Sequence, residues 1–133
     1  MKNTVFASLP SVILGALIAI VPQTFAHACM GHATFGACHY SQQAATGIGV
    51  VILVLGIVSF FVARPMRVGI NIAIAADALL LIAVPNLLIG VCKGQMMHCR
   101  MVMLPTLTVL GTLTIICAAA AAWVESRPKT VRQ

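Results

Sequence analysis

Four long apolar stretches separated by polar connections make up most of the 133-residue chain. They cover residues 5–26, 44–63, 68–91 and 103–124. Each is close to the roughly 20 apolar residues that a helix needs to cross a bilayer. Lipid cannot satisfy the backbone of an open strand, so at this depth the pattern predicts helices. The sequence therefore predicts an all-α membrane protein with four transmembrane helices.

The connections arrange these helices as two hairpins. Only Arg64-Pro65-Met66-Arg67 lies between the second and third stretches, and proline fits a connection because it interrupts the helical hydrogen-bond ladder. Two longer connections, each with two cysteines, join the first stretch to the second and the third to the fourth. We expect a single domain over residues 1–133, with a Cys/His/Met-rich cap formed by these two longer loops.

The distribution of lysine and arginine predicts how the chain is oriented in the membrane. Six cations fall on the side of the short turn and the termini: Lys2, Arg64, Arg67, Arg127, Lys129 and Arg132. Only Lys93 and Arg100 fall on the opposite side. Cytoplasmic loops carry the excess of positive charge. The sequence therefore predicts a multi-pass protein of the bacterial inner (cytoplasmic) membrane, with both termini cytoplasmic and the cysteine-bearing loops outside.

The first stretch also fits a secretory signal peptide, and both interpretations stay open. Lys2, an apolar run, and Ala26 and Ala28 ahead of Cys29 resemble a charged start, an apolar core and a small-residue cleavage site. The run is longer than most signal cores, and three helices pack less readily than four, which favours an uncleaved anchor. Cleavage would leave three spans without changing the orientation of the rest.

Composition supports the membrane assignment. Hydrophobic residues make up 61% of the chain and charged residues 8%, against roughly a quarter charged in soluble domains. The formal net charge of +6 could indicate nucleic acid, but the cations form no stripe and no aromatic residues alternate with them. We therefore expect the chain to contact the lipid bilayer and not nucleic acid.

The predicted outer loops contain no carboxylate, because the only acids of the chain are Asp77 and Glu125. The absence of carboxylates from these loops excludes hard-cation sites, a glycosidase-type acid pair and a Ser-His-Asp triad on that side. The sequence also has no Gly-rich phosphate-binding loop. These observations favour a non-enzymatic protein.

The outer loops are instead rich in ligands for a soft metal ion. Thiolate, imidazole and thioether together suit Cu(I), and the first two also suit zinc. The candidate ligands are His27, Cys29, Met30, His32, Cys38, His39, Cys92, Met96, Met97, His98 and Cys99. Packing at the membrane interface is the alternative for the methionines and histidines, and no ligand framework fixes a geometry.

The outer cysteines have two further interpretations. Four of the five cysteines fall in these loops: Cys29, Cys38, Cys92 and Cys99. In an oxidising compartment they would form two disulfides, each stabilising by roughly 2–4 kcal/mol, and four cysteines allow three pairings. They could also work as a membrane thiol–disulfide oxidoreductase, because nearby Lys93, His98 and Arg100 favour the thiolate. Such enzymes use a C-x-x-C pair, which this chain lacks, so the spacing favours disulfide staples.

Asp77 falls near the middle of the third stretch, where an ionisable residue costs at least roughly 2.5–3.5 kcal/mol on insertion scales. We expect a protonated carboxyl that hydrogen-bonds to Thr112 or Thr114 of the fourth stretch. A proton relay and a contact with a partner subunit are the alternatives. No opposing cation lies at that depth in the sequence.

Small residues along the predicted helices indicate where helices approach closely. They are Gly47, Gly49 and Gly56 in the second helix, Gly69, Ala73 and Ala76 in the third, and Gly111, Ala118 and Ala122 in the fourth. Part of this surface should build the bundle, and the remainder is available to another membrane protein. Pro85 should bend the third helix before the outer loop, and Pro105 suits the first turn of the fourth.

Several short motifs resemble a family of small four-span bacterial membrane proteins of unknown function. The motifs are CHY and GIG in the first half and LIGVC, MHCRM, LP and LG in the second, with the clearest matches at Cys38-His39, Cys92, His98-Cys99-Arg100, Pro105 and Gly111. The resemblance covers most of the chain beyond the first helix, and Asp77 departs from the family's pattern. Members are encoded near FtsX-type ABC transporter permeases, so the resemblance implies an accessory role beside such a permease but no activity.

The leading hypothesis is therefore a non-enzymatic accessory component of a membrane transport system. Its cap either holds a soft metal such as copper or is stapled by disulfides. The alternative hypothesis is a membrane thiol–disulfide oxidoreductase.

Overall fold

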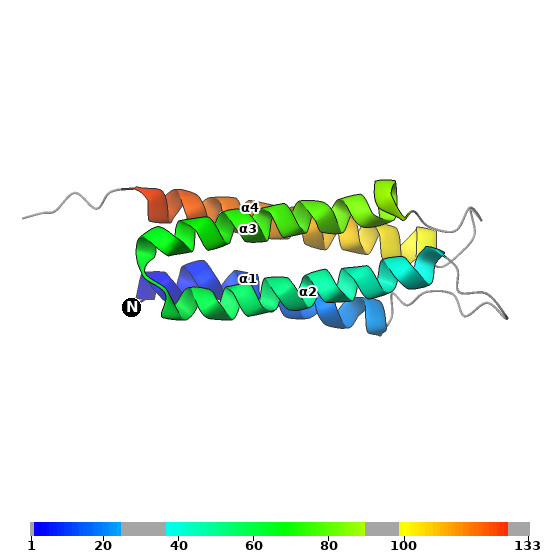
Figure 1. Ribbon diagram of the computed structural model, residues 1–133, viewed down its shortest axis with the longest axis horizontal. Coiled ribbons are helices and arrows are strands. Elements are labelled where there is room, and N and C mark those ends of the chain that lie inside the picture. Colours follow the sequence, from blue (N-terminus) through cyan, green and yellow to red (C-terminus); the bar gives the residue numbers. More distant parts are fainter. Residues whose placement is uncertain (1, 25–36, 90–98, 128–133) are drawn as a thin grey trace, which may run out of the picture.

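The computed structural model describes residues 2–24, 37–89 and 99–127, which are almost entirely helical. The four main helices are Lys2–Ile20 (α1), Ala37–Phe61 (α2), Arg64–Ala83 (α3) and Leu104–Ser126 (α4). They lie side by side and run alternately in opposite directions, so the start of α1, the α2–α3 turn and the end of α4 share one end of the bundle (Figure 1). The predicted all-α fold is confirmed for these residues.

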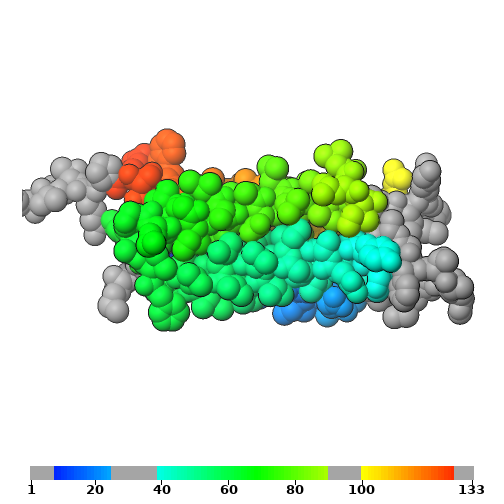
Figure 2. Space-filling view, viewed as in Figure 1, coloured from blue at the N-terminus to red at the C-terminus, as the bar shows by residue number. Residues whose placement is uncertain are grey.

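Three stretches of the described chain are long and apolar enough to cross a membrane: His39–Phe61, Arg64–Leu88 and Arg100–Ser126. The apolar part of α1 found in the same way, Ser8–Gln23, is shorter. Large apolar side chains stay exposed on all four helices, and α2 and α3 together cover one long face of the bundle (Figure 2). Lipid is the environment that such a surface favours, and the helices therefore indicate a membrane protein in contact with the bilayer.

The structure moves several predicted helix boundaries. α2 begins at Ala37 instead of residue 44, so its first two turns contain the polar run CHYSQQ. α3 begins at Arg64 with Pro65 in its first turn, where the missing N–H of proline is harmless, and the connection to α2 shrinks to Val62 and Ala63. Hydropathy marks where a chain is apolar, whereas a helix continues into polar residues as long as its backbone hydrogen bonds do.

Wider helical turns occur on both sides of the second cysteine-bearing loop. α3 continues into a π-helical turn, Val84–Leu88 (η2), in which the N–H of Ile89 donates to the carbonyl of Val84 at 3.0 Å. η2 contains Pro85, where a bend is predicted, and proline disrupts the regular α ladder there. A second π-helical turn, Cys99–Met103 (η3), leads directly into α4. The helical backbone therefore begins at Cys99, although its α-helical part begins at Leu104.

A seam of small residues joins α1 to α2. The buried positions, three and four residues apart, are Ser8, Ser11, Gly15 and Ile18 in α1 and Ser41, Ala45, Gly49, Ile52, Gly56 and Ser59 in α2. A Cβ on Gly15 would lie 2.6 Å from the backbone nitrogen of Leu53. One on Gly49 would lie 2.6 Å from the backbone nitrogen of Ala19. Glycine at these two positions therefore lets the two backbones touch.

α3 and α4 pack through a mixture of large and small side chains. Their buried residues include Ile74, Ala78 and Leu81 of α3 and Leu107, Gly111, Thr114, Ala118 and Ala121 of α4. A Cβ on Gly111 would lie 2.7 Å from Cγ1 of Ile82. Among the predicted small residues, Gly49, Gly56, Gly111 and Ala118 thus lie at buried positions. By contrast, Gly47, Gly69, Ala73 and Ala76 are exposed.

Candidate functional site

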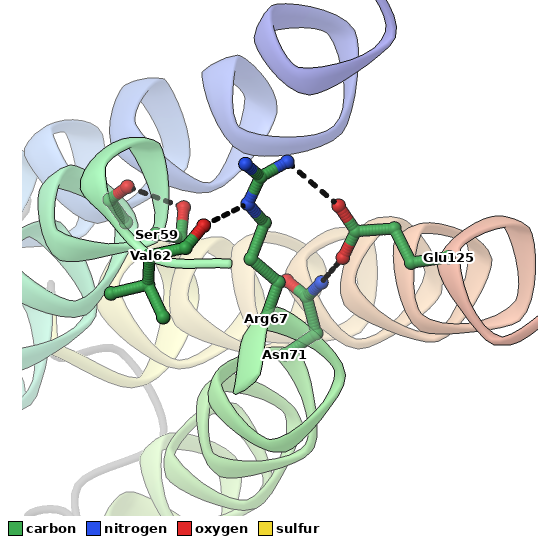
Figure 3. A network of polar contacts seen from close by, with 6 residues as sticks. Ser59, Val62, Arg67, Asn71 and Glu125 are labelled. Carbon is green, nitrogen blue, oxygen red and sulfur yellow. Dashed lines mark hydrogen bonds and ion pairs between the residues drawn. The ribbon is translucent and has the colours of Figure 1, made fainter. Parts of the chain in front are cut away.

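A polar network lies at the end of the bundle that holds the α2–α3 turn (Figure 3). Nη1 of Arg67 lies 3.4 Å from Oε1 of Glu125, and Nδ2 of Asn71 donates to Oε2 of the same carboxylate at 3.2 Å. Nε of Arg67 donates to the backbone carbonyl of Val62 at 2.8 Å. The network therefore ties the end of α4 to the first two turns of α3 and to the α2–α3 connection.

This network is nearly closed to its surroundings. The side chains of Arg67 and Glu125 are 11% and 5% exposed, and Asn71 is 4% exposed. A charge at such a site is tolerated when it is paired and hydrogen-bonded, as both charges are here. With its oxygens already bonded to Arg67 and Asn71, the carboxylate is suited to holding helices together rather than to proton transfer.

The pairing itself is not evident from sequence. The positive-inside pattern uses Arg67 only to predict which side is cytoplasmic, and Glu125 lies 58 residues later. One signal does point to it. Glu125 is the only acid among the charged residues at that end of the sequence, so a helix-end carboxylate among several cations has an obvious class of partner.

The opposite end of the α1–α2 pair is closed by side-chain amides. α1 ends in a 3-10 turn, Val21–Gln23 (η1), and Nε2 of Gln42 donates to the carbonyl of Pro22 at 2.8 Å. Nε2 of Gln23 donates to Oγ1 of Thr46 at 3.0 Å. Carbonyls at the end of a helix lack partners within it. The α2 amide supplies such a partner and fixes the end of α1 against α2.

His39 is the only predicted metal ligand whose side chain the structure describes. Its Nε2 lies 3.2 Å from Nε2 of Gln43, which donates when the ring proton is on Nδ1. Its ring meets the ring of Tyr40 edge to face, with the centroids 6.0 Å apart. Because α2 starts early, Cys38 and His39 lie on its first turn and not in the predicted loop.

The structure does not describe the side chains of the other predicted metal ligands, so it does not test the predicted metal site. Cys99 begins η3, and nothing is described of its side chain or of that of Cys38. The remaining candidates lie outside the described residues: His27, Cys29, Met30, His32, Cys92, Met96, Met97 and His98. Among the described side chains, no three of the His, Cys, Asp and Glu type lie close enough to hold a metal ion. Copper and the disulfides therefore stay predictions.

Asp77 lies on α3 with a partly exposed side chain. The described residues give its carboxyl neither a hydrogen bond nor an ion pair. The hydroxyls of Thr112 and Thr114 donate instead to the carbonyls of Thr108 at 2.7 Å and Leu110 at 2.8 Å. Among the described residues, the hydrogen bond that the sequence predicts from Asp77 to these threonines is absent, and both hydroxyls donate within their own helix.

The middle of the described bundle is apolar. Its fully buried side chains include Ile18, Ile52, Ile74, Leu81 and Leu107. Away from the Asn71–Glu125 contact, buried hydroxyls bond within their own helix: Oγ of Ser59 donates to the carbonyl of Gly56 at 2.6 Å, and Oγ1 of Thr114 donates to that of Leu110. No buried side-chain N or O of the described residues lacks a partner. The described core therefore contains no polar path between the two ends.

The chain matches one known protein family. One family's sequence profile matches residues 11–124, which is most of the chain. The chain belongs to that family, Domain of unknown function (DUF4418). The search of curated proteins and the search of solved structures each returned no match. The predicted membership of a small family of unknown function is confirmed.

The DUF4418 region contains most of the features described above. It includes the α1–α2 seam from Ser11 onward, both cysteine-bearing loops and Asp77, and it ends one residue before Glu125. The first helix therefore contributes to the family's domain.

Proposed function

We propose that this chain is a non-enzymatic accessory component of a membrane transport system. The observation that carries the proposal is the apolar middle of the described bundle, between polar groups at its two ends. A protein that itself moves an ion or a polar solute uses polar groups or water along the path. A closed apolar bundle is better suited to supporting a neighbouring membrane protein.

The partner class in this proposal is an ABC-type permease of the FtsX type, which rests on the family resemblance. Two features of the bundle fit such a role. Its outer surface carries large exposed apolar side chains, among them Val54, Leu79 and Ile116, which suit contact with lipid or with other helices. The clamp of Arg67, Asn71 and Glu125 holds α3, α4 and the α2–α3 connection together and makes the bundle a firm support.

The proposal includes an outer cap built from both cysteine-bearing loops. Cys38 is on the first turn of α2 and Cys99 begins η3, and these two helix starts lie at the same end of the bundle (Figure 1). The cap either binds copper through thiolate, imidazole and thioether groups or is closed by disulfides. In both forms it gives the bundle a docking surface outside the inner membrane.

Photo-crosslinking in native membranes tests the accessory role. Benzoylphenylalanine is placed at Val54, Leu79 or Ile116, one on each of three helices, and unirradiated samples serve as controls. We expect at least one position to crosslink to an ABC-type permease, and deletion of the chain to lower the transport rate of that permease. Crosslinks to lipid alone, with transport unchanged after deletion, would contradict the proposal.

A second assay separates the accessory role from the oxidoreductase alternative. The purified chain is incubated with a dithiol and a water-soluble quinone, and quinone reduction is followed by absorbance. We expect no turnover above the rate without protein. Sustained turnover that is lost on replacing Cys92 and Cys99 by serine would establish a thiol–disulfide oxidoreductase in place of a non-enzymatic subunit.

A further inference from the structure

Asp77 lies near the middle of the candidate membrane span Arg64–Leu88. At 1.5 Å per residue, about 20 Å of helix separates it from Arg64 and about 17 Å from Leu88, the two ends of this candidate span. Its carboxyl has neither a hydrogen bond nor an ion pair within the described residues. The chain's other acid, Glu125, has both. Asp77 is therefore an ionisable group at mid-membrane depth that the bundle does not neutralise.

Asp77 lies where the buried face of α3 meets its exposed face: Ile74 and Leu81, three and four residues away, are buried, whereas the residues on its other side are exposed. Residues three and four apart share a helix face, so Ala73 and Leu80 lie next to Asp77, and Gly69 lies one turn beyond Ala73. Those three neighbours are exposed, and a Cβ on Gly69 would meet nothing within 4 Å. We call Gly69, Ala73, Asp77 and Leu80 the Asp77 strip. Small residues allow a second helix to approach closely, which brings its side chains within reach of the carboxyl.

We propose that the Asp77 strip is the docking surface for a transmembrane helix of the partner that carries a lysine or arginine at mid-membrane depth. The inference rests on the proposed accessory role. Charge complementarity selects this occupant, because a carboxylate and a cation are each costly in lipid and each neutralises the other when paired. A second copy of this chain fits less well, since symmetric docking through the strip would place two carboxylates against each other.

Synthetic helices provide a direct test that needs no native partner. The full chain, with a fluorescent donor at its C-terminus, is reconstituted in phosphatidylcholine vesicles with an acceptor-labelled Leu-Ala transmembrane peptide. One peptide carries a single central lysine and its match carries leucine there. We expect energy transfer to show association with the lysine peptide about 3- to 20-fold stronger, the range of measured polar contacts between membrane helices. Asp77→Asn should remove most of this preference and Asp77→Glu should keep it.

A matched pair of variants tests whether the contact is at the strip. Ala73→Leu adds bulk beside Asp77 and should weaken binding of the lysine peptide. Ala120→Leu makes the same change at an exposed position of α4 and should leave binding unchanged. Circular dichroism and resistance to unfolding by dodecyl sulfate identify any variant that fails to fold. If Asp77→Asn is such a variant, binding of the lysine peptide is compared between the wild type and Asp77→Glu instead.

Two results would overturn the inference. One is equal binding of the lysine peptide by the wild type and by folded Asp77→Asn. The other is self-association of the wild type that Asp77→Asn abolishes, because a second copy would then occupy the strip. If crosslinking identifies a permease partner while the lysine peptide shows no preference, the accessory role stands and only the Asp77 inference fails.

Discussion

Gly47→Ala and Gly49→Ala add the same methyl group two residues apart on α2, and the structure predicts opposite effects. At Gly49 the new Cβ would lie 2.6 Å from the backbone nitrogen of Ala19 and 2.9 Å from its Cα, where ordinary contacts are 3.4–4 Å. Both struck atoms belong to the backbone of α1, so no side-chain rotation relieves the overlap. At Gly47 the new Cβ would meet nothing within 4 Å.

The size of the effect follows from the geometry. Restoring ordinary contact at Gly49 requires α1 and α2 to separate by about 1 Å, and a gap of that size forfeits a quarter to a half of the dispersion attraction across it. Overpacking alone typically costs about 1–3 kcal/mol. We expect Gly49→Ala to lower the free energy of unfolding by about 2–4 kcal/mol. Gly47→Ala should be neutral or stabilise by up to about 1 kcal/mol, because alanine favours a helix over glycine.

The measurement is the free energy of unfolding in bicelles, obtained by steric trapping or by titration with dodecyl sulfate. A second-site change sharpens it. Ala19→Gly combined with Gly49→Ala should not restore stability, since the nitrogen and Cα that are struck remain in glycine. Equal shifts for Gly47→Ala and Gly49→Ala, or full rescue by Ala19→Gly, would refute the packing argument.

Three further predictions concern the two ends of the bundle. Glu125→Gln should destabilise by about 3–5 kcal/mol in the same unfolding assay, because it leaves the buried Arg67 charge unpaired, and the double variant Arg67→Met with Glu125→Leu should lose less. Alkylation without prior reduction, read by intact mass, should give one adduct, on Cys117, and the mass of the full chain. Three or more adducts would show that the cysteines of the two loops are reduced. A mass lower by about 2 kDa or more would show that the first helix has been cleaved. If those cysteines are reduced, the copper content of protein from copper-replete cells should fall when His98→Ala and Cys99→Ser are combined, and a copper-free wild type would exclude the metal.

The helical class and the three long spans follow from sequence because apolar length is a property of whole segments. The helix ends beside the cysteine-bearing loops do not follow from the sequence. The run CHYSQQ is polar, so hydropathy places it in a loop, whereas the backbone ladder of α2 continues through it. η3 likewise extends the fourth helical path to Cys99, ahead of the apolar stretch.

The hydropathy pattern predicts how deep a residue lies in the membrane, but it does not determine which way the residue faces around the helix axis. Gly47 and Gly49 look equivalent in the sequence, and only the position of α1 makes one a contact and the other an open surface. Counting residues along the helices predicts a similar membrane depth for Asp77 and Thr114. In the structure, however, Asp77 is partly exposed on α3, and the Thr114 hydroxyl bonds within α4. The Arg67–Glu125 pair has the same origin, because it requires both helices to be packed before the partner can be named.

The clamp between α3 and α4 also bears on how the chain is made. Glu125 is synthesised 58 residues after Arg67, so a nascent chain carries a guanidinium without its carboxylate until the last helix has been inserted. The contact between α3 and α4 can then close only after α4 is in place, and charge neutralisation accompanies that step. A ribosome-released fragment ending before Glu125 should consequently be cleared by membrane proteases faster than the full chain, which a pulse-chase experiment measures. In this sense the ion pair distinguishes a bundle that contains the end of α4 from one that lacks it.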